Sequence, residues 1–289
     1  MKGLFTALIT PFDSRGRVDE DRLANLVRFQ LSGGTEGIYP CGSTGLGPML
    51  SIEERKSVAR TVIESTQRKV PVVVQVGCAD TASTVKLARH AEDMGADAVA
   101  SLTPFYYKPG DRATSKHFEA LSKALGIPLF AYNIPQFTGN NLLAPIASKL
   151  ARAGIISGIK DSSRDFLQLL TILEAVPDDF VVMNGTEEYG LFAIMSGADG
   201  LVSGGASPLP ELFESMVSAQ RRGDVRAALT AQKVVQQVRD LVKTAPIPAY
   251  YEILRLRGVD CGSPRRPFLP MGRSDTARTL KGLRRLGLI

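Results

Sequence analysis

The sequence has few of the residues that bind metals or cross-link chains. Its 289 residues include three cysteines and two histidines. Cys41, Cys78 and Cys261 are odd in number and show no Cys-x-x-Cys spacing, so neither a disulfide framework nor a zinc site is predicted. His90 and His117 lie apart in helix-like segments, which is typical of surface or packing residues. The sequence therefore predicts no metal centre.

Long apolar runs and a leader pattern are also missing. No uninterrupted apolar stretch reaches membrane-spanning length, and residues 1–4 lead into a strand-like segment without a cleavable signal pattern. We expect a soluble, cytoplasmic protein with no membrane partner. Hydrophobic residues make up 44% of the sequence, which is enough for one large core.

The formal net charge is +6, and basic residues become denser between positions 265 and 285. A basic segment can contact nucleic acid, but this one lacks interleaved aromatic side chains and fits the solvated side of a terminal helix. We therefore expect no nucleic-acid partner. A non-catalytic basic barrel that binds an anion stays open as an alternative of another class.

Short apolar segments recur about every thirty residues with helix-like segments between them, which is typical of βαβ units. The predicted helices include one capped by Asp19 and one opened by a capping box at Ser51 and Glu54. The predicted strands are residues 3–10, 37–40, 71–76, 97–102, 127–132, 155–160, 180–183 and 199–202. Eight such units favour an α/β protein with a closed (β/α)8 barrel, the TIM barrel, over an open sheet.

The alternation stops after Pro208. Residues 211–222, 224–243, 248–257 and 275–286 have the pattern of helices with polar faces. No linker-like or low-complexity stretch separates them from the barrel. The sequence thus predicts a barrel over residues 1–207 and a C-terminal helical region over 208–289 that packs on it.

In such a barrel the active site lies at the C-terminal ends of the strands. Lys160 ends the sixth apolar strand, where loss of solvation favours the neutral amine and makes it a nucleophile toward a ketone. A lysine at this place can also extend to solvent or pair with Asp161.

Three other strand ends carry polar groups. The loop after the second strand holds Gly42, Ser43 and Thr44, whose hydroxyl and backbone N–H groups suit a small carboxylate or phosphate. Tyr106 follows the fourth strand and Tyr132 ends the fifth. Each of these could be a turn or a packing residue. Together with Lys160 they could form a Schiff base with a keto acid, move protons and hold its carboxylate.

Several motifs, in the same order, resemble the dihydrodipicolinate synthase/N-acetylneuraminate lyase superfamily of Schiff-base class I aldolases along nearly the whole chain. They are Ala7-Leu-Ile-Thr-Pro-Phe12, Cys41-Gly-Ser-Thr-Gly45, Leu50-Ser-Ile-Glu-Glu54, Ala91-Glu-Asp-Met-Gly-Ala-Asp97, Pro104-Phe-Tyr-Tyr-Lys-Pro109, Tyr132-Asn-Ile-Pro135 with Thr138-Gly139, and Gly158-Ile-Lys-Asp161.

The resemblance implies a role for each matching position. Lys160 matches the lysine that forms the Schiff base with pyruvate, and Tyr132 the proton-shuttling tyrosine. Ser43 and Thr44 match the pair that holds the keto-acid carboxylate, and Tyr106 matches the tyrosine that reaches into the neighbouring subunit's site. Further positions matching the pyruvate pocket are Gly42, Gly185 and Val202. The resemblance also implies a homotetramer, built as a dimer of dimers, that uses no cofactor.

Two departures bear on the second substrate. Dihydrodipicolinate synthases typically place an arginine before Thr-Gly to bind that substrate's carboxylate, and here Phe137 stands there. Leu46 replaces the usual glutamate after the glycine loop. The run Thr44-Gly-Leu-Gly-Pro48, with Val74–Gly77 and Gly262–Pro267, is similar to archaeal 2-keto-3-deoxygluconate aldolases.

From these features we expect a pyruvate-dependent lyase that cleaves a 2-keto-3-deoxy sugar acid to pyruvate and an aldehyde such as glyceraldehyde. The alternative is a 4-hydroxy-tetrahydrodipicolinate synthase that condenses pyruvate with aspartate semialdehyde. Sialic acid lyases, hydroxy-oxoglutarate aldolases and keto-deoxy-sugar dehydratases also stay open.

Overall fold

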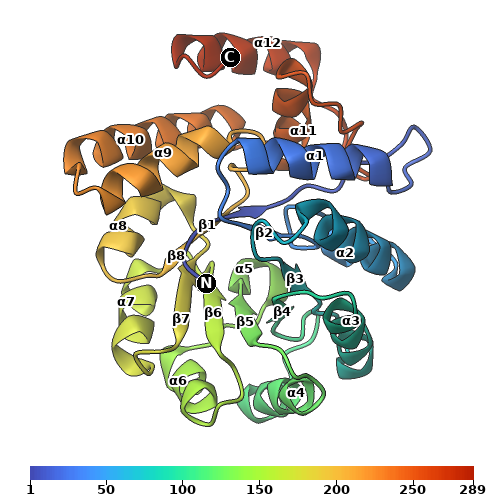
Figure 1. Ribbon diagram of the computed structural model, residues 1–289, viewed down its shortest axis with the longest axis vertical. Coiled ribbons are helices and arrows are strands. Elements are labelled where there is room, and N and C mark those ends of the chain that lie inside the picture. Colours follow the sequence, from blue (N-terminus) through green and yellow to red (C-terminus); the bar gives the residue numbers. More distant parts are fainter.

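The protein is described by a computed structural model that covers residues 1–289. Parallel strands form the centre of the molecule and helices surround them (Figure 1). The strands are β1 (Gly3–Ala7), β2 (Gly37–Tyr39), β3 (Val73–Gln75), β4 (Ala98–Leu102), β5 (Leu129–Asn133), β6 (Gly158–Asp161), β7 (Val181–Asn184) and β8 (Gly200–Ser203).

Their order is β2-β1-β8-β7-β6-β5-β4-β3 in one 8-stranded sheet. A parallel bridge between Ile38 and Val72 joins the two ends of this sheet, and the Ile38 N–H donates to the Pro71 carbonyl at 3.0 Å. The sheet thereby curls into a barrel, which confirms the predicted TIM-barrel fold.

Helices follow the strands in alternation. They are α1 (Glu20–Ser32), α2 (Ile52–Thr66), α3 (Thr81–Asp93), α4 (Asp111–Lys123), α5 (Pro135–Thr138), α6 (Ala144–Arg152), α7 (Phe166–Ala175), α8 (Gly190–Met195), α9 (Pro210–Arg221), α10 (Val225–Val242), α11 (Pro246–Leu256) and α12 (Arg273–Arg285). Short 3₁₀ turns lie at Gly47–Met49 and Glu187–Tyr189. None of the helices combines the length and apolar character that a bilayer crossing requires.

The helix starts follow from local chemistry. The Asp19 carboxylate accepts from the Arg22 N–H at 3.0 Å, and Ser51 and Glu54 form the predicted capping box at the start of α2. Helix α4 begins at Asp111, directly after Gly110, whose φ of 80° is one that glycine adopts readily.

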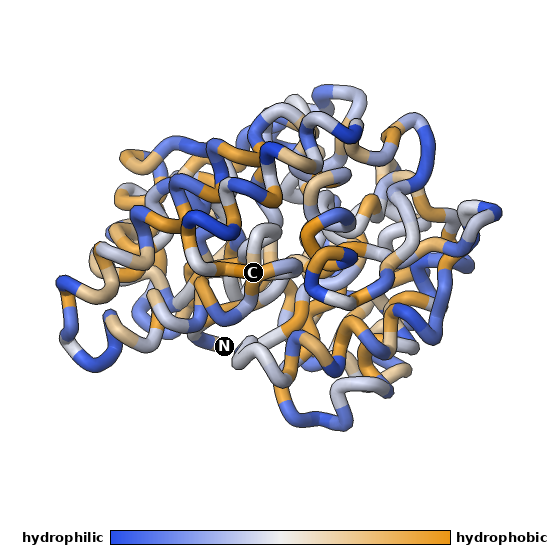
Figure 2. Tube along the Cα trace, turned by 90° about the horizontal axis from the view of Figure 1, so that it is seen from above, coloured by the Kyte–Doolittle hydropathy of each residue, from blue (hydrophilic) through white to orange (hydrophobic).

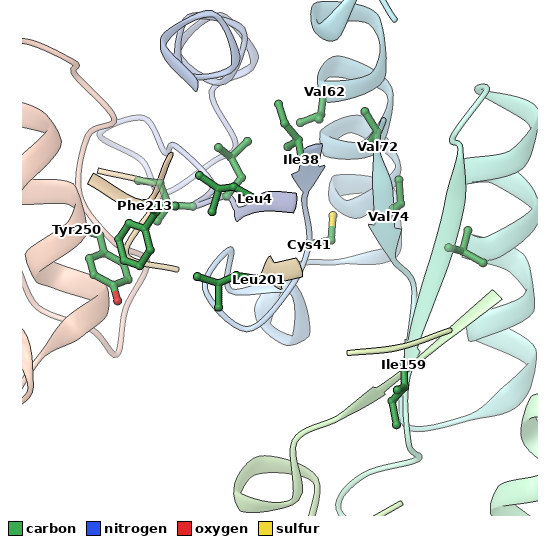
Figure 3. Close-up of a cluster of buried hydrophobic side chains, with 14 of the residues drawn as sticks. Leu4, Ile38, Cys41, Val62, Val72, Val74, Ile159, Leu201, Phe213 and Tyr250 are labelled. Carbon is green, nitrogen blue, oxygen red and sulfur yellow. The ribbon is translucent and has the colours of Figure 1, made fainter. Parts of the chain in front are cut away.

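Side chains of each strand alternate between two apolar clusters. An outer cluster between the strands and the helices includes Leu4, Ile38, Val62 and Leu201, which Figure 3 shows projecting from neighbouring elements. A smaller cluster fills the barrel interior and includes Phe5. Along the peripheral helices hydrophilic and hydrophobic residues alternate (Figure 2), as expected for helices with one buried and one exposed face.

The C-terminal region packs on the barrel. Helix α9 follows β8 and lies against α8 and α10, while α12 lies at the outer edge of the molecule (Figure 1). The Tyr251 hydroxyl on α11 donates to the Thr10 carbonyl at 2.6 Å, and Arg265 pairs with Glu54 at the start of α2. These contacts fix the region beside the loops that follow β1 and β2. The division at residue 208 stays a prediction, since α9 contacts both parts.

Candidate active site

Lys160 lies near the end of β6, in register with Tyr132 on β5 and Met183 on β7. Lys160 is only 4% exposed to solvent. Burial lowers the pKa of Lys160 to about 7, while the Glu187 carboxylate partly opposes this shift. Near neutral pH a substantial fraction of the amine is therefore unprotonated and nucleophilic.

The alternative pairing of Lys160 with Asp161 does not form. The Asp161 carboxylate accepts instead from Asn133 at 2.7 Å, Ser163 at 2.6 Å and Gln168 at 3.2 Å. Successive residues on a strand point to opposite faces, so Lys160 faces the barrel axis and Asp161 faces the helices. The lysine is free of a carboxylate partner within ion-pair distance.

Two tyrosine rings flank the amine. The Lys160 Nζ atom lies over the Tyr132 ring at 4.1 Å from its centroid and over the Tyr39 ring at 4.3 Å. The two rings meet edge to face, with their planes at 81° and their centroids 5.8 Å apart. Tyr39 was not predicted as a site residue.

The Tyr132 hydroxyl is placed to exchange a proton with the serine of the glycine loop. Its oxygen lies 3.4 Å from the Ser43 Oγ atom, and either group can donate. Burial raises the pKa of Tyr132, and the hydrogen bond with Ser43 moderates that rise. The phenol thus starts protonated at neutral pH and can act as a proton donor.

These groups open into a cavity of about 430 Å³ at the C-terminal ends of the strands. Six of the predicted residues line it: Ser43, Thr44, Tyr132, Lys160, Gly185 and Val202. Gly185 has to be a glycine, because a Cβ atom there would lie 1.9 Å from Ser162 Oγ and 3.1 Å from Lys160 Cε. The absence of a side chain at Gly185 therefore leaves space beside the Lys160 side chain.

Two predicted residues lie outside this cavity. Gly42 is buried under the ring of Tyr39, where a Cβ atom would lie 3.2 Å from the ring. Tyr106 is 85% exposed, has a φ of 76°, and its ring packs edge-on against Tyr107. The carboxylate-binding role of Gly42 and the cross-subunit role of Tyr106 stay predictions.

The C-terminal region supplies a second wall that sequence reasoning missed. It contributes Arg239 from α10, Ile247 and Tyr250 from α11, and Phe268 from the segment before α12. No local signal could have revealed them, because each lies in a polar or amphipathic stretch whose position depends on packing. Phe137, on α5 after β5, also lines the cavity and is 70% exposed.

Arg239 is already bound to acidic and phenolic groups. Its guanidinium contacts Glu188 at 3.0 Å, Glu187 at 3.5 Å and the Tyr250 hydroxyl at 3.3 Å. Glu187 also accepts from the Ser203 hydroxyl at 2.8 Å and the Gly205 N–H at 2.6 Å. The charge of Arg239 is therefore balanced by carboxylates and is not free to clamp an anion.

Comparison with known proteins places this architecture in a family. The profile of the "Dihydrodipicolinate synthetase family" matches residues 1–284. The chain is 34% identical to a "4-hydroxy-tetrahydrodipicolinate synthase" of Methanosarcina acetivorans over 294 residues, which cover 100% of this chain and 99% of that protein.

Comparison with solved structures leads to the same family. The crystal structure of YagE, a prophage protein of the dihydrodipicolinic acid synthase family from E. coli in complex with pyruvate, superposes with a TM-score of 0.96 at 26% identity, covering 100% of this chain and 99% of that one. The crystal structure of KD(P)GA from T. tenax gives a TM-score of 0.91 at 30% identity, covering 99% of both chains. This chain therefore belongs to the dihydrodipicolinate synthetase family and is a carbon–carbon lyase of the pyruvate-dependent aldolase class.

Proposed function

We propose that the protein reversibly cleaves a 2-keto-3-deoxy sugar acid, such as 2-keto-3-deoxygluconate, to pyruvate and an aldehyde through a Schiff base on Lys160. The observation that carries this proposal is the buried amine of Lys160, which lines the cavity with Nζ 4.1 Å from the centroid of the Tyr132 ring. This arrangement supplies both the nucleophile and a proton donor.

The first step joins the amine to the substrate. The Lys160 lone pair attacks the C2 keto carbon; the nitrogen gives up one proton and the carbonyl oxygen takes one up, which gives a neutral carbinolamine. Loss of this hydroxyl as water, with one proton supplied to it, leaves a cationic iminium. Tyr132, 3.4 Å from Ser43, is the group placed to deliver these protons.

The iminium then acts as the electron acceptor for cleavage. A base removes the proton of the C4 hydroxyl, the C3–C4 bond breaks, and its electron pair moves into the iminium to form an enamine. The aldehyde departs. Protonation of the enamine at C3 regenerates an iminium, and water releases pyruvate and the free amine. In this scheme no step requires a cofactor.

The carboxylate next to C2 is assigned to Ser43 and Thr44. Both line the cavity on the side of Lys160, and their hydroxyls can donate hydrogen bonds. The Thr44 Oγ1 atom lies 2.8 Å from the place that a Cβ on Gly204 would occupy, so this glycine leaves room beside the hydroxyl. Val202 adds an apolar side chain to the lining of the cavity.

The lining of the cavity favours an uncharged, hydroxylated fragment. Phe137 stands where synthases of the family typically carry the arginine for aspartate semialdehyde, and Arg239 is balanced by Glu187 and Glu188. An anionic group beside Arg239 would also meet these two carboxylates, whereas sugar hydroxyls can bond to them and to Tyr250.

A 4-hydroxy-tetrahydrodipicolinate synthase is the second candidate. The similar curated proteins carry that name, for example at 33% identity in Chlorobium phaeobacteroides. Arg164 also lines the cavity, and none of the ion pairs of the structure includes it, so it offers a cation to an aldehyde that carries a carboxylate. Arg164 is the observation that favours the synthase.

A competition between the two aldehydes separates the candidates. The purified protein is incubated with pyruvate and either glyceraldehyde or aspartate semialdehyde, and product formation is measured by mass spectrometry. Preferential turnover of glyceraldehyde supports the aldolase. A kcat/KM that favours aspartate semialdehyde would replace the proposal by the synthase. Phe137→Arg is the matched variant, and we expect it to raise kcat/KM for aspartate semialdehyde and not for glyceraldehyde.

The family resemblance also supports a homotetramer, built as a dimer of dimers, in the cytoplasm. Tyr106, exposed in the single chain, would then be covered by the partner subunit. Sedimentation of the purified protein tests this assembly, and a monomer at micromolar concentration would contradict it.

A further inference from the structure

The amine of Lys160 is enclosed by two aromatic faces, and the proposed chemistry uses the hydroxyl of only one. Tyr132 exchanges protons, whereas Tyr39 has no part in the steps above. Yet the centroid of the Tyr39 ring lies 4.3 Å from Nζ, against 4.1 Å for Tyr132. A nitrogen cation at this point meets the negative face of a ring on two sides.

The Tyr39 ring is held firmly in this position. Tyr39 ends β2, pairs with Ala7 of β1, and is 1% exposed. The ring of Tyr132 lies edge-on to it, and Gly42 passes so close that a Cβ atom there would lie 3.2 Å from the ring. The ring therefore cannot swing away from the amine without displacing the glycine loop.

The Tyr39 hydroxyl is buried and has no hydrogen-bond partner. Burial raises the pKa of Tyr39 well above its ordinary value, so the phenol stays protonated at neutral pH. An unpartnered, protonated hydroxyl neither relays a proton nor compensates a charge through hydrogen bonding. What Tyr39 offers Lys160 is the face of its ring.

We propose that Tyr39 is a further catalytic residue, whose ring face stabilises the cationic iminium that Lys160 forms with the keto acid. The neutral amine, the ketone and one proton give the iminium and one water, so a positive charge arises on the nitrogen that touches the ring. In a desolvated site a cation–π contact changes such an equilibrium by roughly 30-fold. This inference rests on the lysine–pyruvate step of the proposed function and is independent of the aldehyde.

The test measures the equilibrium constant for iminium formation with pyruvate, by borohydride trapping and mass spectrometry, at a pH above the pKa of the lysine. Tyr39→Phe keeps the ring face, and we expect a constant within about twofold of the unsubstituted protein. Tyr39→Leu removes the face, and we expect a constant lower by roughly 30-fold. A series of increasingly fluorinated phenylalanines at position 39 keeps the shape and weakens the ring's negative face, so the constant should fall stepwise with fluorination.

Phe5→Leu is the matched control. Phe5 belongs to the same inner cluster and packs against Gly37 on the strand of Tyr39, but Nζ does not lie over its ring. Loss of this aromatic side chain should leave iminium formation within about twofold, because no cation meets it. A drop equal to that of Tyr39→Leu would mean that any loss of interior packing has the same effect, and would overturn the inference.

Two results contradict the role of the ring directly. A flat response across the fluorinated series, or a Tyr39→Phe constant as low as that of Tyr39→Leu, would overturn it. The fluorinated series decides the question even where Tyr39→Leu fails to fold. If the unsubstituted protein traps no pyruvate, the proposed function and this inference both fall. If it traps pyruvate and the series is flat, only this inference falls.

Discussion

The cavity has two halves that are built differently. Strand ends form one half, with Tyr132 and Lys160 as register neighbours on β5 and β6 and Ser43 on the loop after β2. The C-terminal region forms the other half, where Arg239 and Tyr250 reach in from α10 and α11. Backbone pairing fixes the first half, and side-chain contacts between helices fix the second.

We assign the proposed bond cleavage to the strand-end half and the choice of aldehyde to the C-terminal half. Strand ends joined by backbone hydrogen bonds hold a nucleophile and a proton donor in a fixed relation, which a reaction common to a family requires. Helix α10 is held instead by side-chain contacts such as the Arg239–Glu188 ion pair. We therefore expect substitutions in the first half to affect turnover, and those in the second to affect which aldehyde binds.

The largest effect is expected at Lys160. Lys160→Arg keeps a cation but cannot form a Schiff base, so kcat/KM should fall by about 10⁴-fold or more. Steady-state kinetics measures this change, and the thermal unfolding midpoint shows whether the barrel is intact. Retention of more than a few per cent of the activity in a folded variant would remove Lys160 from its assigned place.

Tyr132→Phe should have the next largest effect. It removes the hydroxyl that lies 3.4 Å from Ser43 and keeps the ring over Nζ. Loss of an acid–base group lowers kcat by about 10²-fold or more. Ser43→Ala is the companion variant, and we expect it to slow the same step. An unchanged kcat in Tyr132→Phe would assign proton transfer to another group.

Phe268→Ala tests the second half of the cavity. Phe268 lines the cavity and lies far in sequence from the strand-end residues. Removing its ring should raise the KM for the aldehyde by about 10-fold, since one apolar contact is lost. Iminium trapping with pyruvate alone should not change. A loss of pyruvate trapping would show that the two halves are not separable.

The smallest effect is a shift in pH dependence. The rate of Schiff-base formation should fall as the pH drops through about 7, because protonated Lys160 is not nucleophilic. The Glu187 carboxylate raises the pKa of Lys160, so Glu187→Gln should lower it and move this acidic limb to lower pH. A limb that moves upward, or stays in place, would contradict the electrostatic link between Glu187 and the amine.

The same comparison explains what could be predicted from the sequence. Apolar runs at regular spacing predicted the strands, and Lys160, Tyr132 and Ser43 were singled out as site candidates because they end such runs or follow them closely. No separate helix was predicted for α5 to α8, and α5 and α8, with 4 and 6 residues, are too short to show a helical period.

The residues that were missed carry no local signal. Tyr39 reads as an ordinary core residue of an apolar strand, and only the barrel brings its ring over Nζ. In the sequence, Arg239 fits the polar face of an amphipathic helix. Only tertiary packing brings it to Glu187, which lies 52 positions earlier in the chain. Long-range placement of this kind cannot be read from local pattern.

The central claim is that Lys160 forms the covalent bond to pyruvate. The most direct measurement is reduction of the protein with borohydride in the presence of pyruvate, followed by peptide mass spectrometry. The account predicts a single reduced pyruvate adduct on Lys160, and none in Lys160→Arg. An adduct on another lysine, or no adduct at saturating pyruvate, would contradict it.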